Sequence, residues 1–223
     1  MFSASTAVPR EQKTLRSAHE MERSGKNIIH WEKYGCRRSG GMETYMKKIL
    51  FLIIDMQNGF LNRNTEGIDR RILEFLEKIQ GRAAVAGTRY VNNEHTACYV
   101  FEGWKACMAG TEEAEILPAL RGRMERVFDK DKYSCWNEEM KQFIRENKIE
   151  KVYFAGVNTG CCVLHSAFDF YNDLVDCSVI EDLCGSTSGI REHEAALIVL
   201  RSCITEERVI TAEQAVMEIA GEV

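Results

Sequence analysis

The sequence contains little proline and no long apolar segment. Only two of its 223 residues are proline, which excludes an extended proline-rich linker and is compatible with one domain of ordinary size. No apolar run reaches the ~18 residues that a membrane-spanning helix needs, so we expect no membrane partner. Positive charge is not in excess either. The net charge of −5 argues against a nucleic-acid partner.

Paired-cysteine signatures are also missing, although cysteine itself is abundant. The nine cysteines form no C-x-x-C pair, and no histidine stands at zinc-finger spacing. Most lie in apolar runs such as VDCSVI (175–180), which is typical of buried free thiols in a reducing compartment. We therefore expect a cytoplasmic protein without a structural metal or a cofactor.

The first 45 residues differ in pattern from the remainder. They carry scattered charge and no sustained hydrophobic period, so we expect a mostly disordered extension or a wrongly assigned start, with Met42 and Met46 as alternative starts. An amphipathic arm that docks on a partner subunit is the alternative. Residues 46–223 form the expected domain. The segment MKKILFLIIDM (46–56) is not interpreted as a signal peptide, because its apolar core is short and ends at Asp55.

From residue 47 onward, apolar runs alternate with amphipathic segments. The runs predict strands over 48–56, 84–91, 126–130, 151–157, 176–183 and 207–211. The amphipathic segments predict helices over 68–80, 137–148, 160–172 and 191–202, a helical turn within 110–120 and a last helix after Thr211. Asn137 and Thr211 are the expected N-caps of the second and the last of these helices. This alternation predicts an α/β fold, a three-layer, doubly wound, mostly parallel sheet with helices on both faces.

Reactive side chains stand at the ends of three predicted strands. Asp55 ends the first strand, Lys130 ends RVFDK (126–130), and KVYFAGV (151–157) leads to Cys161 and Cys162. Ligands of such sheets bind beyond the carboxyl ends of the strands, so we expect these groups to meet there. Each also has a purely structural interpretation, as a strand-end carboxylate, a solvated lysine or helix packing.

A thiol at this position suits nucleophilic catalysis. We expect Thr159 to cap the helix that follows, and the positive end of that helix and a nearby ammonium to lower the cysteine pKa. Asp55 could take the thiol proton and later deliver it to a leaving amine. Backbone N–H groups at the start of the helix could hold an oxyanion.

Three ordered motifs resemble the isochorismatase-like cysteine hydrolases, which include nicotinamidases and N-carbamoylsarcosine amidases. DMQNGF (55–60) resembles D-x-Q-x-x-F, DKDKYSCW (129–136) resembles K-x-x-x-S-x-F, and GVNTGCCVLHSAFD (156–169) resembles G-V-x-T-x-x-C-V-x-x-T-A. The resemblance covers about residues 46–216. It assigns the lysine of the second motif to Lys130 rather than Lys132, and the nucleophile to Cys162 rather than Cys161.

The resemblance implies an Asp55–Lys130–Cys162 triad that hydrolyses an amide or ureide C–N bond of a small molecule through a thioester. It also implies a cis peptide between Val157 and Asn158, an oxyanion hole built from the N–H groups of Asn158 and Cys162, and self-association as dimers or tetramers. Further candidates for substrate contacts are Phe60, Trp104, Trp136 and, for a substrate carboxylate, Arg89.

Other interpretations remain open at this stage. Nicotinamidases place a D-x-H segment and a further histidine around a metal, whereas TRYVNNEHT (88–96) offers only His95. Isochorismatases need no thiol, so Cys162 favours an amide or ureide over a vinyl ether. Isochorismatase-type or nicotinamidase hydrolysis is thus the alternative. A non-catalytic binding or thiol-redox module using Cys161 and Cys162 is an alternative of another class, although adjacent cysteines rarely form an unstrained disulfide.

Overall fold

The computed structural model describes residues 49–221. The expectations for residues 1–45, including the extension and the alternative starts, lie outside the described residues. None of the helices between residues 49 and 221 is long and apolar enough to cross a membrane.

Six strands form one parallel sheet with the order β3-β2-β1-β4-β5-β6. They are β1 (Ile49–Ile54), β2 (Ala84–Tyr90), β3 (Arg126–Lys130), β4 (Lys151–Val157), β5 (Asp176–Gly185) and β6 (Val209–Ile210). The chain moves outward from β1 to β3 and then returns to β4 on the other side of β1. The strand order therefore reverses between β1 and β4, where the carboxyl ends of neighbouring strands diverge and leave room for a site.

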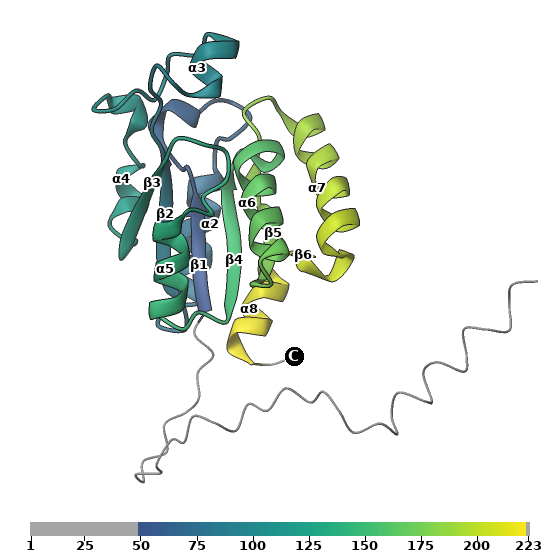
Figure 1. Cartoon of the computed structure of the whole chain (residues 1–223). Coiled ribbons are helices and arrows are strands. Elements are labelled where there is room, and N and C mark those ends of the chain that lie inside the picture. Colours follow the sequence, from purple (N-terminus) through teal and green to yellow (C-terminus); the bar gives the residue numbers. More distant parts are fainter. Residues whose placement is uncertain (1–48, 222–223) are drawn as a thin grey trace, which may run out of the picture. The chain divides into compact units, whose positions relative to one another are not determined.

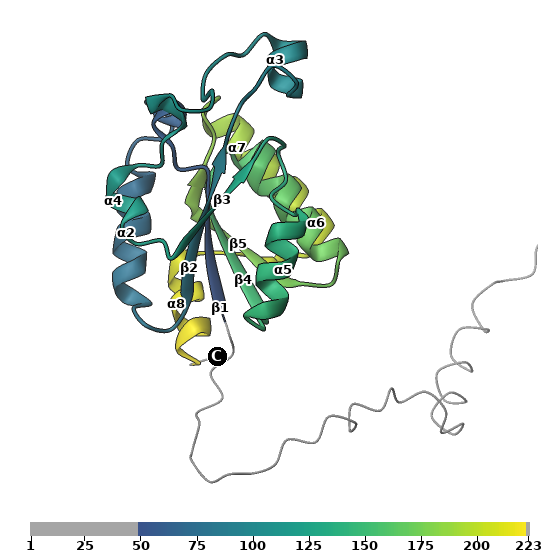
Figure 2. The same cartoon turned by 60° about the vertical axis from the view of Figure 1, so that its left-hand side comes forward.

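Helices cover both faces of this sheet, as the sequence predicted. Figure 2 shows α2, α4 and α8 on one face and α5, α6 and α7 on the other. Their bounds are α2 (Ile68–Lys78), α4 (Pro118–Arg121), α5 (Glu138–Glu146), α6 (Leu164–Asn172), α7 (Ile190–Ile204) and α8 (Ala212–Ala220). A further helix, α3 (Ala97–Glu102), lies beyond the carboxyl ends of the strands (Figure 1). The sequence did not predict α3.

The central strand shows why the sheet is buried on both faces. Leu50, Leu52 and Ile54 pack into the core under α5, α6 and α7, whereas Phe51 and Ile53 pack into the core under α2 and α8. Successive side chains of a strand point to opposite faces. A strand sandwiched between two helical layers must therefore be apolar at every position, which explains the continuous run that the sequence displays.

Caps explain where several helices begin. Asn137 accepts a hydrogen bond from the Met140 N–H at the start of α5, and Thr211 forms a capping box with Gln214 at the start of α8. Both caps were predicted from the sequence. Thr96 caps α3 in the same way, by accepting from the Tyr99 N–H.

Candidate active site

Asp55 follows β1 directly and is held there by the neighbouring strand. Its backbone lies in the left-handed region, with φ of 47°, which aspartate tolerates better than most residues. The Thr88 hydroxyl donates to Asp55 Oδ1 at 2.7 Å, and the Asp55 N–H donates to Thr88 Oγ1 at 3.2 Å. The carboxylate is fully buried, so its orientation is fixed by β2.

Gln57, the glutamine of the first motif, holds the segment that follows. Its side-chain amide donates to the carbonyls of Tyr90 and Ala114 at 2.9 and 2.8 Å, and its oxygen accepts from the Tyr90 N–H at 2.7 Å. All of these contacts are buried, so Gln57 ties the loop after β1 to the end of β2. The Asp55 carboxylate therefore rests on a fixed backbone.

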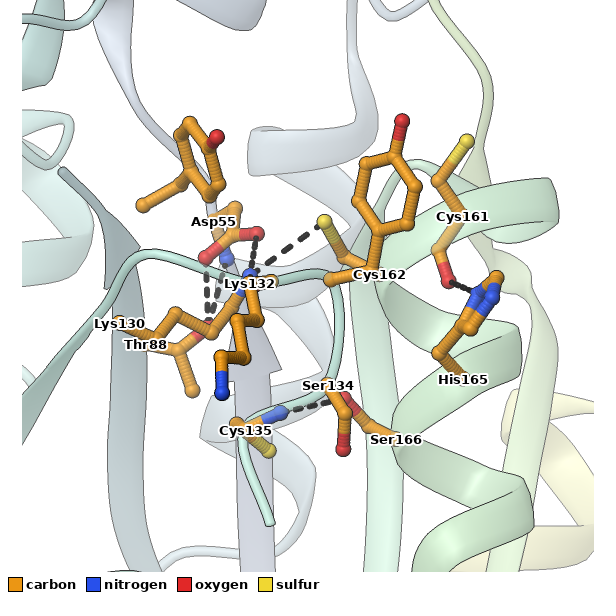
Figure 3. Close-up of polar contacts among 12 residues, drawn as sticks. Asp55, Thr88, Lys130, Lys132, Ser134, Cys135, Cys161, Cys162, His165 and Ser166 are labelled. Carbon is orange, nitrogen blue, oxygen red and sulfur yellow. Dashed lines mark hydrogen bonds and ion pairs between the residues drawn. The ribbon is translucent and has the colours of Figure 1, made fainter. Parts of the chain in front are cut away.

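Lys130 is the last residue of β3, and its ammonium joins the acid to the thiol. Lys130 Nζ lies 2.7 Å from Asp55 Oδ2 and 3.4 Å from Cys162 Sγ, and it donates to the Lys132 carbonyl at 3.0 Å. Figure 3 shows the three side chains converging, with the Cys162 sulfur turned toward Lys130. Lys130 thus provides the ammonium beside Asp55, and Lys132 provides only a carbonyl oxygen that accepts from it. Lys130 is the lysine that the motif spacing selected.

Cys162 lies in a π-helical turn, Thr159–Val163, that links β4 to α6. The N–H groups of Cys161 and Val163 both donate to the Asn158 carbonyl at 3.1 Å. π-Helical turns of this kind occur frequently at functional sites. The peptide between Val157 and Asn158 is cis, as expected. The Asn158 side chain accepts from the Thr187 N–H at 2.7 Å, which ties the turn to the loop after β5.

The expected capping role of Thr159 was wrong. No side chain caps the π turn, and Thr159 Oγ1 instead shares a 2.8 Å hydrogen bond with His193 Nδ1 of α7. Thr159 is fully buried, so this bond satisfies its hydroxyl within the core. The threonine side chain thus links the π-helical turn to α7 rather than capping a helix.

The expected lowering of the Cys162 pKa was also wrong. Burial raises the pKa of Cys162 well above its ordinary value, the Asp55 carboxylate raises it further, and Lys130 acts in the opposite direction. Burial alone would lower the pKa of Lys130, but Asp55 and Cys162 outweigh burial and raise it. The resting site therefore holds a carboxylate–ammonium pair beside a neutral thiol, because the buried sulfur lacks the hydration that a thiolate needs.

A cavity of about 400 Å³ opens beside the sulfur. Cys162, which is 5% exposed, lines it together with Asn158, so a carbonyl placed in the cavity can reach the thiol. Two of the aromatic residues predicted for substrate contact, Phe60 and Trp104, line the cavity and stack with ring centroids 5.7 Å apart.

Two other predicted substrate contacts lie elsewhere. Trp136 packs on Phe170 and donates from its indole to Asp173, and it does not line the cavity. Arg89 forms a bidentate pair with Asp129 at 2.7 and 2.8 Å and does not line the cavity either. Both residues have structural partners away from this cavity, and substrate contact by Trp136 or Arg89 stays a prediction.

Several cavity residues were missed from the sequence. Glu102 comes from α3, and Glu192 comes from the first turn of α7. Tyr90 is the last residue of β2, and Tyr133 lies between β3 and α5. The sequence signals for α3 were Thr96, which caps its start, and Gly103, which follows its end. The helix has six residues, which is too short for a clear hydrophobic pattern. His95 has no partners for a metal: in the part of the chain that the structure describes, no three His, Cys, Asp or Glu side chains gather into a possible ligand set.

The fold and the site define an α/β protein with a buried acid–ammonium–thiol cluster at the strand-order reversal. The family model for the isochorismatase domain matches residues 50–214. The chain belongs to the isochorismatase family, a family of hydrolases.

Individual relatives match this chain over a short segment or at low sequence identity. The Isochorismatase family protein 2A of Dictyostelium discoideum is 32% identical over 73 residues, which cover 32% of this chain and 36% of that protein, so the match spans about a third of the relative. An isochorismatase-like hydrolase from Alkaliphilus metalliredigens has a similar structure, with a TM-score of 0.68 and 21% identity over 77% of this chain and 98% of that one. The nicotinamidase PncA from Bacillus subtilis gives a TM-score of 0.65 and 21% identity over 73% and 99% of the two chains. These structures share the fold.

Proposed function

We propose that the protein is a cysteine hydrolase of a small-molecule amide or ureide, and that it cleaves the C–N bond through a thioester. The observation that carries the proposal is the position of Lys130 Nζ, 2.7 Å from Asp55 Oδ2 and 3.4 Å from the sulfur of Cys162, which lines a cavity. An acid, a cation and a nucleophile within contact of one another are the parts that acyl transfer requires.

Asp55 generates the nucleophile. The pKa of Cys162 is raised, so a free thiolate is scarce at neutral pH and the proton must leave as the sulfur attacks. Asp55 Oδ1 is occupied by the Thr88 hydroxyl, whereas Oδ2 contacts Lys130 and accepts no well-formed hydrogen bond among residues 49–221. Oδ2 is therefore the oxygen that takes the thiol proton.

The remaining steps follow from the same groups. The Cys162 sulfur adds to the carbonyl carbon, and the N–H groups of Asn158 and Cys162 hold the oxyanion. The C–N bond then breaks, Asp55 gives its proton to the departing nitrogen, and a thioester remains. Water attacks the thioester, and Asp55 takes a proton from that water. The C–S bond then breaks to release a carboxylic or carbamic acid, and Asp55 returns the proton to the sulfur, which restores the thiol. Lys130 stays protonated and orients Asp55 throughout.

The test is ammonia release from a panel of small primary amides and ureides. We expect turnover by the wild type and a loss of at least ~10³-fold in kcat/KM for Cys162→Ala, since the nucleophile is gone. Cys161→Ala is the matched control, because Figure 3 shows the Cys161 sulfur pointing away from Lys130. It should retain most of the activity. Equal turnover by wild type and Cys162→Ala, or a larger loss in Cys161→Ala, would contradict the proposed nucleophile.

A further inference from the structure

The cavity wall carries negative charge that the proposed chemistry does not use. Its only ionised side chains are the carboxylates of Glu102 and Glu192, and none of the described residues that line it is Lys, Arg or His. Lys130 lies behind the wall and is paired with Asp55, so the catalytic cluster adds no net charge. A ligand in the cavity therefore faces two unbalanced carboxylates.

The two carboxylates come from different elements and are held near the nucleophile turn. Glu102 ends α3 and accepts a hydrogen bond from the Tyr133 hydroxyl at 3.3 Å. Glu192 lies in the first turn of α7, with Oε1 3.9 Å from Cys161 Sγ. A Cβ at Gly160 would lie only 2.7 Å from Glu192 Oε1, so the glycine leaves the space that this carboxylate occupies.

Neither carboxylate is neutralised by the protein around it. Within residues 49–221, no Lys or Arg forms a salt bridge with Glu102 or Glu192. Asp129, by comparison, is paired with Arg89. Because no described Lys or Arg pairs with the two carboxylates at the cavity, a ligand there can supply the counter-charge.

Aromatic rings also line the cavity. The Trp104 ring stacks on Phe60. The ring centroids of Trp104 and Tyr90 lie 5.9 Å apart, with an angle of 47° between the two rings. Ring faces attract alkylated and guanidinium-type cations electrostatically, and rings combined with carboxylates are the usual environment of a bound organic ammonium. A substrate carboxylate would instead meet two like charges, which disfavours binding.

We propose that the cavity selects substrates that carry a positive charge away from the scissile carbonyl, with Glu102 and Glu192 as the residues that recognise this charge. The inference rests on the proposed amide hydrolysis and adds to it the class of substrate. It replaces the carboxylate-bearing substrate that Arg89 suggested from the sequence.

The test uses three primary amides of similar size that end in trimethylammonium, in the isosteric tert-butyl group or in a carboxylate. Dissociation constants are measured by calorimetry with Cys162→Ala, which binds without turnover, and kcat/KM is measured with the wild type. We expect the trimethylammonium amide to bind about tenfold more tightly than the tert-butyl amide, and the carboxylate amide to bind most weakly. Added salt should reduce the preference, because it screens the two carboxylates.

Variants assign the preference to the two residues. Glu102→Gln and Glu192→Gln should each reduce the preference for the trimethylammonium amide over the tert-butyl amide. The double variant should bring the ratio of their two dissociation constants close to one without changing the affinity for the tert-butyl amide. Glu213→Gln is the matched control, since Glu213 occupies the first turn of α8 as Glu192 does in α7. It should leave the ratio unchanged.

The outcomes separate this inference from the proposed function. Equal or weaker binding of the trimethylammonium amide, no measurable binding of it, or a ratio that survives the double variant would overturn the charge preference. Turnover of the tert-butyl amide would still support the hydrolase in that event. Conversely, cation-selective binding with no turnover of any amide would support the charge preference and contradict the hydrolase.

Discussion

Two ion pairs lie on the same part of the sheet and behave differently. Lys130 and Asp129 are neighbours at the end of β3, and their partners are Asp55 and Arg89. The side chains of the Lys130–Asp55 pair are 2% and 0% exposed, whereas those of the Arg89–Asp129 pair are 29% and 53% exposed. Because successive strand residues point to opposite faces, a shift of one residue separates a buried pair from a surface pair.

The comparison shows that charge alone does not identify a site residue. Both pairs have a shortest contact of 2.7 Å, so this distance does not distinguish them. What differs is solvation. Water screens the charges of the outer pair, whereas each buried charge of the inner pair depends on the other for its stabilisation. The inner pair also contacts a third group, the Cys162 thiol, whose pKa is raised by burial and by Asp55 and lowered by Lys130.

The largest expected effect is the loss of one member of the inner pair. Lys130→Met leaves the Asp55 carboxylate buried without its counter-ion, so we expect a decrease of about 3–5 kcal/mol in the free energy of unfolding and loss of amide turnover. Chemical denaturation monitored by circular dichroism measures the first quantity. Adding Asp55→Asn should restore part of the stability but none of the turnover, since the buried charge has been removed along with the base.

An additive double variant would contradict this account. If Lys130→Met and Asp55→Asn destabilised independently, the two side chains would not be energetically coupled in the folded protein. Retained activity in Lys130→Met would show that the ammonium is not needed to orient the acid.

The fold was largely predictable because its signals are local. Continuous apolar runs predicted the six strands, and the Asn137 and Thr211 caps placed two helix starts correctly. Asp55, Lys130 and Cys162 could be singled out since each stands at a strand end in a recognisable spacing, and parallel strands bring such ends together.

The rest of the site depends on tertiary structure. Glu102 enters the cavity through α3, whose six residues carry too weak a pattern to predict. The pairing of Arg89 was not predictable either, because no sequence pattern shows that Asp129 lies beside it in the next strand. The sign of the Cys162 pKa shift was wrong for a related reason. The sequence shows a helix start and a lysine, which favour the thiolate, but does not show the burial that outweighs them.

The second prediction separates the influences on the thiol. Alkylation by iodoacetamide requires the thiolate, so in the wild type the reaction of Cys162 should be slow at neutral pH and should rise about tenfold per pH unit below its raised pKa. The carboxylate raises that pKa and the ammonium lowers it. Asp55→Asn should therefore speed alkylation at a fixed pH, and Lys130→Met should slow it.

Mass spectrometry of the peptide that contains Cys162, in a Cys161→Ala background, measures these rates. Unfolded protein is the control for the intrinsic reactivity of the thiol. Slower alkylation in Asp55→Asn than in the wild type would mean that the carboxylate promotes ionisation in the resting site, which is the opposite of the electrostatic argument.

The smallest effect is expected for the outer pair, and it completes the comparison. Arg89→Met removes a partly exposed ion pair, so the free energy of unfolding should fall by less than about 1 kcal/mol. Amide turnover should be unchanged, because Arg89 contacts Asp129 and Glu115 rather than the cavity. The same denaturation and ammonia assays apply, with Asp129→Asn as the partner variant. A rise in KM for carboxylate-bearing amides in Arg89→Met would instead return this arginine to substrate binding and would remove the distinction between the two pairs.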